Sequence, residues 1–198
     1  ITVEGQLSLS NAALLQQMAT DIRAYFDANP IQRFFPIAPN DGMTRVCGCD
    51  QCAPQVEEDK GKHGHFSNYM WAFVNRLAAE VARTHPNGMI GTIAYEGYLD
   101  PPDQIERLHP NVAVMICQSR GSFADTEQRD AVHRRITEWH KKTDNIYLWE
   151  YYRYNLPPFP WGPAPYPHLI REDLGFLKGI GKGEFIESES WGPGQEAR

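Results

Sequence analysis

The chain has 198 residues, 41% of them hydrophobic, and a formal net charge of −6 at pH 7. This length and composition suit one globular domain, residues 1–198, with a sizeable core. The negative charge argues against nucleic-acid binding, which normally needs a basic surface. No apolar run approaches the roughly 18 residues of a membrane-spanning helix, so we expect no membrane span.

Helical and strand-like segments alternate along the chain. Ser10-Asn11 provides an N-cap for a first helix, which Asn29-Pro30 ends. The pattern then predicts a strand over 33–39, a surface loop over 55–64, a helix that starts at 67 and is closed by 85–88, strands over 89–95 and 112–117, a helix over 126–142, a strand over 146–151, a helix from 167 until Gly179, and a strand over 183–186. The connection over 96–111 is short for a full helix and should hold a single turn. Apolar strands that alternate with helices predict a parallel sheet covered on both faces.

Five strands are too few for a (β/α)8 barrel, which has eight strands and typically about 250 residues. The sequence therefore predicts either an open α/β sheet or the later part of a barrel whose opening strands are absent. No G-x-G-x-x-G or G-x-x-x-x-G-K-[ST] pattern follows a strand. The usual nucleotide-binding reasons for an open sheet are therefore missing.

Asn40-Asp41-Gly42 follows the first predicted strand, within the run FFPIAPNDG. Because α/β folds form their crevice at the carboxyl ends of strands, a carboxylate at this position is a candidate catalytic group. Asn, Asp and Gly are also the usual turn residues, so a simple turn explains the same pattern.

Acids lie at other strand ends as well. Glu96 follows the second strand, Glu150 lies within the fourth, and Glu187 and Glu189 follow the fifth. Parallel strands would direct these ends toward one edge of the sheet. Solvated loop positions explain Glu96 and Glu189 equally well, and Glu187 could instead pair with an arginine.

Glu150 lies between Trp149 and Tyr151 in an apolar run, where an acid is costly unless it is paired or functional. It is therefore a second candidate catalytic group. Four aromatic residues at or near the predicted strand ends could contact a ligand with their rings: Tyr95, Trp149, Tyr151 and Trp191. Trp149 would suit the core equally well.

Cys47, Cys49 and Cys52 form a C-x-C-x-x-C pattern, and His63 and His65 follow it. Three thiolates with His63 as the fourth ligand suit tetrahedral Zn²⁺ in a closed, structural site. Free thiols are one alternative. A disulfide from Cys52 to one of the other cysteines is another, and would fit a secreted setting.

The order of several motifs resembles a known family. GQLSLSN before a helix, APNDG, C-x-C-x-x-C, FVNRLAAEVARTHP, GTIAY, NVAVMIC and NIYLWEYYRYN together resemble a bacterial glycoside-hydrolase-like family, long catalogued as of unknown function, that includes endo-β-N-acetylglucosaminidases. The resemblance covers about residues 5–190. It implies a (β/α)8 TIM-type barrel, with this chain as the portion from about the fourth strand to the eighth. It also implies a glycan substrate and, from exported members, a secreted or periplasmic location.

The resemblance favours Asp41 as a catalytic group, since related sugar hydrolases carry an acidic pair at the end of the strand before it, and Glu150, a candidate from its apolar setting, would be the second. Here the neighbour is Asn40, so that pair does not transfer directly. The residues expected to contact substrate are Asn40, Tyr95, Glu96, Trp149, Tyr151, Glu187 and Trp191. No cofactor is required for such chemistry: a carboxylate nucleophile about 5–5.5 Å from the acid, or the 2-acetamido carbonyl of the substrate, would serve.

Two other functions fit the sequence. One is a carbohydrate-binding relic that keeps the rings but lacks a complete acid pair. The other is a zinc-stabilised interaction module that pairs through its sheet edge. Because an exposed edge is normally covered, we expect the missing barrel half or a partner chain to cover it in either case.

Overall fold

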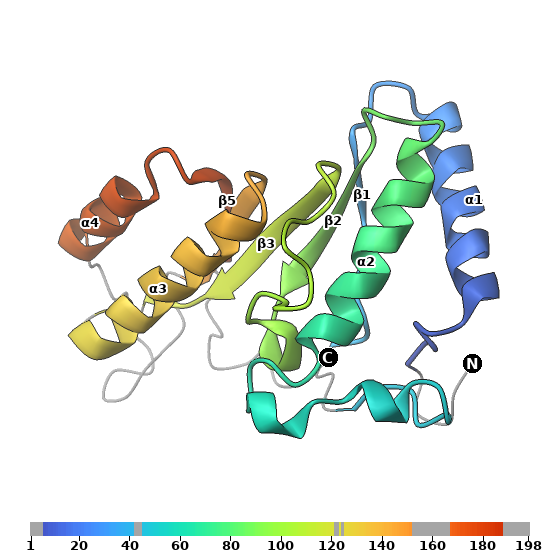
Figure 1. Ribbon diagram of the computed structural model, residues 1–198. Helices are drawn as coiled ribbons and strands as arrows, with labels where there is room; N and C mark the ends of the chain where they lie inside the picture. The colour runs from blue at the N-terminus through green and yellow to red at the C-terminus, as the bar shows by residue number, and fades with distance from the viewer. Residues whose placement is uncertain (1–5, 42–44, 121–122, 124, 152–166, 188–198) are drawn as a thin grey trace, which may run out of the picture.

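The computed structural model describes residues 6–41, 45–120, 123, 125–151 and 167–187. Helices and strands alternate in this part of the chain (Figure 1). The helices are α1 (Ala12–Ala28), α2 (Ser67–Ala82), α3 (Thr126–Lys142) and α4 (Pro167–Leu177), and the strands are β1 (Phe34–Pro36), β2 (Met89–Ala94), β3 (Val112–Gln118), β4 (Ile146–Tyr151) and β5 (Gly181–Glu187). Three short 3₁₀ turns are η1 (Ala53–Gln55), η2 (Glu58–Lys60) and η3 (Glu96–Tyr98).

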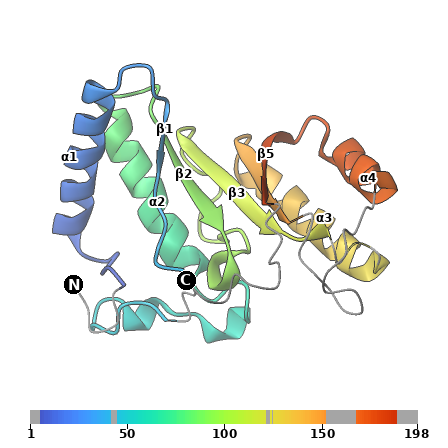
Figure 2. The same ribbon diagram turned by 180° about the vertical axis from the view of Figure 1, so that it is seen from behind.

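The strands form one parallel sheet in the order β1-β2-β3-β4-β5. Helices α2 and α3 lie in front of the sheet in Figure 1 and behind it in Figure 2, so both cover the same face. The sheet is strongly curled: the rings of Phe34 in β1 and Tyr147 in β4 meet edge to face with centroids 5.8 Å apart, although β2 and β3 lie between those strands. The small residues Gly91 and Ala113 line the same hollow. The fold is thus a half-barrel, which confirms the α/β prediction and is consistent with part of a TIM-type barrel.

The main core lies between the helices and the convex face of the sheet. The strand residues that contribute to it are Ile90, Val112, Val114, Ile116, Ile146 and Leu148, all at most 1% exposed. Trp71 of α2 and Trp139 of α3 meet edge to face at 4.6 Å within this core. Their indole N–H groups donate to the carbonyls of Tyr98 and Leu99 at 3.1 and 2.9 Å. The two tryptophans therefore anchor the connection between β2 and β3 where a covering helix would otherwise lie.

Several sequence predictions are confirmed, with shifted boundaries. Asn11 caps α1, with its side-chain oxygen accepting from the backbone N–H of Ala13 at 2.8 Å. The β2–β3 connection holds a single short turn, as expected. The strand predicted over 33–39 is reduced to three residues, because Pro36 and Pro39 lack the N–H that a ladder needs. The surface loop predicted over 55–64 is only partly irregular, since η2 lies within it.

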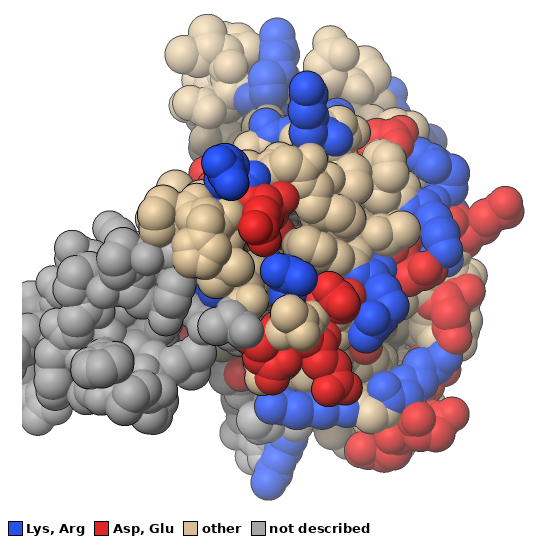
Figure 3. All heavy atoms as spheres, turned by 90° about the vertical axis from the view of Figure 1, so that its left-hand side faces the viewer, with Lys and Arg blue, Asp and Glu red and all other residues tan. Residues whose placement is uncertain are grey.

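The concave inner face of the sheet is apolar and open in the described part of the chain. It borders a hollow of about 450 Å³, and its lining includes Phe34, Ile93, Met115, Tyr147 and Trp149. The side of the molecule formed by α3 and α4 is more polar. Acidic and basic side chains are intermixed where α3 and α4 lie (Figure 3), with ion pairs such as Arg129–Glu172. None of the described helices combines the length and apolarity that a bilayer span requires.

Candidate functional site

The carboxyl ends of all five strands meet at one edge of the curled sheet, because every strand pair is parallel. The segment from residue 45 to 66 lies at the same edge (Figure 1). On the inner face here, the indole N–H of Trp149 donates to Glu187 Oε2 at 3.0 Å. Nearby, Cys117 Sγ and the Tyr151 hydroxyl are 3.9 Å apart. Side chains from β3, β4 and β5 therefore converge on one surface.

Electrostatic effects on Cys117 show that acids from several segments lie close enough to this end of the sheet to act on its thiol. Burial raises the pKa of Cys117 to about 11, while its hydrogen bond with Tyr151 opposes the rise. The negative charges of Glu150, Glu187 and Asp41 raise the pKa further. Asp41 follows β1 and Glu187 ends β5, so the two outer strands both place an acid near the central strand.

Glu96 belongs to the same neighbourhood. Burial raises the pKa of Tyr98, and the charges of Glu96 and Asp41 add to the shift. Burial likewise raises the pKa of Tyr151, with contributions from Cys117, Glu187 and Tyr95. The rings and acids at this edge therefore influence one another across β1, β2, β3, β4 and β5.

The backbone at Glu96 is strained. Its φ angle is 45°, the one positive φ of a non-glycine residue among the described residues, and such a conformation costs on the order of 1–3 kcal/mol. The next residue is Gly97, where a Cβ would lie 2.6 Å from the Phe66 ring and 2.8 Å from the His65 ring. The tight packing behind Gly97 thus holds Glu96 directly after β2 in a conformation that it would not otherwise adopt.

Glu150 lies on the opposite face of the sheet from these groups. Along β4, Ile146, Leu148 and Glu150 are buried, whereas Trp149 and Tyr151 are only partly buried and face inward. The Glu150 carboxylate accepts from the backbone N–H of Arg120 and from the Gln118 side chain, both at 2.7 Å. This acid is therefore enclosed between the sheet and the helices rather than open to the inner face.

Arg120 is the centre of a buried charge network. Its guanidinium donates to Asp173 of α4 at 2.6 Å and to Glu184 of β5, and its Nε lies 3.6 Å from Glu150 Oε2. His133 of α3 contacts the other oxygen of Asp173 at 2.8 Å. One guanidinium is thus shared by three carboxylates and ties α4 and β5 to the centre of the sheet.

The network shifts the pKa of two of its members. Burial raises the pKa of Glu150 to about 7, against the opposing effects of Arg120 and Gln118. Burial also disfavours the charge of Arg120, but the carboxylates of Glu150 and Asp173 outweigh it and raise the pKa of the guanidinium. Burial therefore dominates the shift of Glu150, whereas the surrounding carboxylates dominate that of Arg120.

Most of the residues expected to contact substrate come together. Trp149, Tyr151 and Glu187 lie on the inner face, where Trp149 donates to Glu187 and Tyr151 contacts Cys117. Asp41, Tyr95 and Glu96 lie close enough to this end of the sheet to act on the pKa of its buried groups. Glu150 does not face this surface. Trp191 and Glu189 lie outside the described residues.

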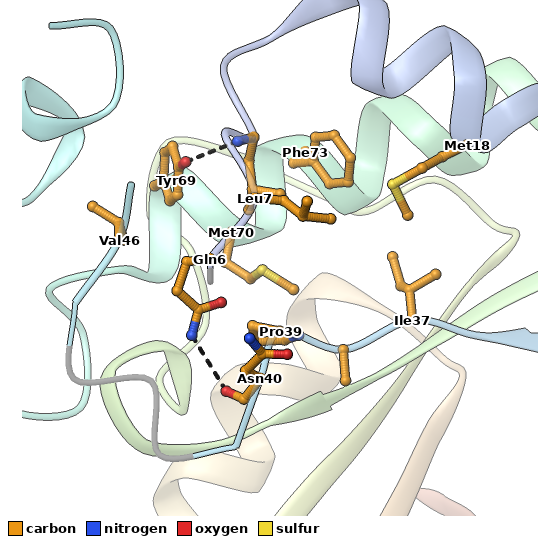
Figure 4. Close-up of a pocket in the computed structure, with 12 residues that line it drawn as sticks. Gln6, Leu7, Met18, Ile37, Pro39, Asn40, Val46, Tyr69, Met70 and Phe73 are labelled. Carbon is orange, nitrogen blue, oxygen red and sulfur yellow. Dashed lines mark hydrogen bonds between the residues drawn. The ribbon is translucent and has the colours of Figure 1, made fainter. Parts of the chain in front are cut away.

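Asn40 lies at the margin of the site. It lines a small cavity of about 80 Å³ between the end of β1, α2 and the segment before α1 (Figure 4). The Gln6 side chain donates to the Asn40 carbonyl at 3.4 Å. The end of β1 is therefore fastened to residues that precede the first helix.

Sequence reasoning overlooked two residues that shape this region, Tyr98 and Arg120, and treated Cys117 only as a buried apolar side chain. Cys117 lies on the inner face one residue before the end of β3, and the alternation from Met115 was a usable signal. Arg120 follows β3 by two residues, and no local pattern links it to Glu150, 30 residues further on.

The cysteines form a compact group. The sulfur atoms of Cys47, Cys49 and Cys52 lie within 4.8 Å of one another, so they could hold a metal ion, and all three are free thiols in the structure. His63, expected as the fourth ligand, is not brought into this group. Its carbonyl accepts from the backbone N–H of Asp100, beside η3.

A family model described as Domain of unknown function (DUF4838) matches residues 3–195. The chain belongs to this family. No curated protein and no solved structure matches the chain. This result agrees with the resemblance to a family long catalogued as of unknown function. The relationship of that family to glycoside hydrolases stays a prediction.

Replacing Arg120 with Met should strongly destabilise this DUF4838 domain. The carboxylates of Glu150 and Asp173 would lose their shared cation, and breaking a buried ion pair from one side costs about 3–5 kcal/mol. Urea denaturation measures this loss in the free energy of unfolding. Arg129→Met is the matched control, because its pair with Glu172 is more exposed and should cost less than about 1 kcal/mol. Equal, small losses in both variants would contradict a central role for Arg120.

The raised pKa of Glu150 predicts a pH dependence of stability. Between an ordinary value of 4.5 and the folded value of about 7, folded Glu150 keeps a proton that the unfolded chain has lost. The folded state then binds more protons, so Glu150 makes the free energy of unfolding fall as the pH rises through this range. Urea denaturation at successive pH values should show this slope, and Glu150→Gln should lose it. A Glu150 carboxyl that titrates at or below 4.5 by carbon NMR would rule the explanation out.

Proposed function

We propose that the chain is a glycoside-hydrolase-like domain that acts on N-acetylglucosamine-containing glycans. The observation that carries this proposal is the Trp149–Glu187 hydrogen bond on the inner face. It is supported by Asp41 and Glu96, which follow β1 and β2 at the edge where the carboxyl ends of the parallel strands lie. Glycoside hydrolysis needs two such groups, one on each side of the bond to be broken. In barrel enzymes, the catalytic residues come from the ends of several different strands.

Asp41 and Glu187 are the pair that best fits the two roles. They follow the two outer strands of a sheet that curls toward itself, so a sugar between them would be flanked from both sides. The Trp149 N–H holds one oxygen of Glu187 in place on the inner face, which suits this carboxylate to stabilise the positive charge that develops on the sugar. Asp41 would then protonate the leaving oxygen, and Glu96 would bind a sugar hydroxyl.

Glu150 receives a different role in this proposal. Its carboxylate is 0% exposed and is held by groups that cover the helix side of the sheet. We therefore assign it to the support of β4 and β5 rather than to the reaction.

The inner face also offers a platform for sugar rings. Trp149 packs against Phe185 of β5 with ring centroids 4.4 Å apart, and Tyr147 and Phe34 continue the row of rings toward β1. Flat apolar rings beside carboxylates and hydroxyl groups are typical of carbohydrate sites, because a sugar presents both C–H faces and hydroxyl edges. No cofactor is needed for the proposed reaction.

We further propose that additional strands close the sheet into a complete (β/α)8 barrel. Parallel sheets are normally covered on both faces, and the inner face of this one carries a continuous apolar surface. A complete barrel would fill this hollow with side chains from the missing strands. The part of the hollow near the amino ends of the strands would then become core. The part at the carboxyl ends of the strands would remain open to substrate.

Replacing Glu187 with Gln, or Asp41 with Asn, should lower kcat for a chromogenic 2-acetamido-2-deoxy-β-glucoside by about 100-fold or more, as expected for loss of a general acid or its partner. Glu172→Gln on α4 is the matched control, since that acid is exposed on the helix side. Initial rates at several substrate concentrations measure the effect.

Three outcomes of this assay are informative. If the parent chain binds the sugar, measured by quenching of tryptophan fluorescence, but does not hydrolyse it, the domain is a carbohydrate-binding relic. If it neither binds nor hydrolyses the sugar, the proposal is wrong. If a 2-hydroxy analogue is hydrolysed as fast as the acetamido sugar, the acetamido group of the substrate is not the nucleophile.

The open inner face predicts that the chain alone self-associates, because large exposed apolar patches bind one another. Phe185→Ser should lower this association more than Leu174→Ser, although the two side chains are almost equally exposed, at 46% and 47%. Phe185 lies on the inner face and Leu174 on α4. Light scattering after size exclusion measures the mass of the assembly. A parent chain that stays monomeric would show that the inner face needs no cover.

A further inference from the structure

The cysteine group lies in a small cluster of its own, outside the main core. Cys47, Cys52 and Tyr69 are buried together, and Leu9 and Val46 pack against them. Three segments meet here: residues 6–10, the loop over 45–52 and the first turns of α2. A cluster of this size gives little apolar burial, so it is a place where a bound ion would add substantial order.

The sulfur atoms are arranged for a common ligand. They lie within 4.8 Å of one another, and Zn–S bonds of about 2.3 Å would hold neighbouring sulfurs about 3.8 Å apart. A contraction of about 1 Å or less would therefore be enough. Thiolates are soft ligands that favour zinc among the common divalent ions.

Hydroxyl groups around Cys52 suit a thiolate rather than a thiol. The Tyr69 hydroxyl donates to Cys52 Sγ at 3.1 Å and accepts from the backbone N–H of Leu9 at 3.0 Å. Ser8 Oγ lies 3.2 Å from the same sulfur and 3.7 Å from Cys49 Sγ. Donors of this kind stabilise negative charge on sulfur and orient the ligands of a metal.

We propose that Cys47, Cys49 and Cys52 bind one Zn²⁺ ion as three thiolates and that this ion fastens residues 6–10 to the 45–52 loop and to α2. Binding releases the protons of those cysteines that are still thiols, with no change in oxidation state. Among the described residues, no fourth His, Cys, Asp or Glu joins the group. Because Cys49 is exposed, solvent reaches the ion and water takes the fourth position. The site is independent of the proposed glycan chemistry.

Zinc stoichiometry of the reduced, purified chain tests this proposal, with affinity measured against a competing chelator. We expect one Zn²⁺ per chain. Cys49→Ser is the informative variant, because an exposed side chain can be replaced without a loss of packing. It should weaken binding by more than the roughly 10–100-fold that loss of an outer-shell partner costs. The matched control is Cys117→Ser on β3, which should keep the parent affinity.

Co²⁺ substitution reports the ligands directly. The parent chain should show thiolate-to-cobalt charge-transfer absorption in the near ultraviolet, and Cys49→Ser should lose most of it. His63→Ala should keep the parent spectrum and affinity. A loss in His63→Ala would overturn the three-thiolate ligand set.

Amide hydrogen exchange tests whether the ion holds residues 6–10 against the 45–52 loop and α2. Removal of the metal by a chelator should speed exchange over residues 6–10 and 46–56 and leave α3 unchanged. Unchanged exchange over residues 6–10 would overturn that role. The proposal as a whole fails if the reduced chain binds no zinc, if mass analysis finds a disulfide among the three cysteines, or if the bound metal is iron with acid-labile sulfide.

Discussion

The alternation of side chains along strands that are covered on one face determines what each residue of this domain can do. Successive residues of a strand point to opposite faces, so β4 sends Tyr147, Trp149 and Tyr151 inward and buries Ile146, Leu148 and Glu150 against the helices. A shift of one residue would place the rings in the core and the acid on the open face. The register of β4 with β3 and β5 therefore determines which of its residues pack against the helices and which lie at the candidate site.

The Arg120 network links these two faces. β5 has little apolar packing, since Phe185 and Ile186 are both more than 40% exposed. Glu184 instead binds Arg120, which is held in turn by Asp173 and Glu150. Glu184 lies three residues before Glu187 on the same strand. A polar anchor on the covered face thus holds the strand that carries Glu187, and Glu150 takes part in this anchor from the side away from the inner face.

Local signals in the sequence predicted much of the fold. The N-cap at Asn11, the apolar strands and the short β2–β3 turn all depend on neighbouring residues, and all are found. The face of Glu150 could not be predicted, because β4 carries large apolar side chains on both faces and its alternation is hidden. Its partner Arg120 is 30 residues away. His63 was assigned from its spacing to the cysteines, but its loop turns toward Asp100 and away from their sulfur atoms.

The segment before α1 connects the cysteine group with the end of β1. Gln6 binds the carbonyl of Asn40, the residue before Asp41, and Leu9 binds the Tyr69 hydroxyl that contacts Cys52. Residues 6–9 therefore contact both the surroundings of the cysteine group and the end of β1. β1 contributes only three residues to the sheet, so its ladder alone gives little control over Asp41. Precise placement of a carboxylate on such a short strand requires support from outside the sheet, and the segment before α1 is positioned to provide it.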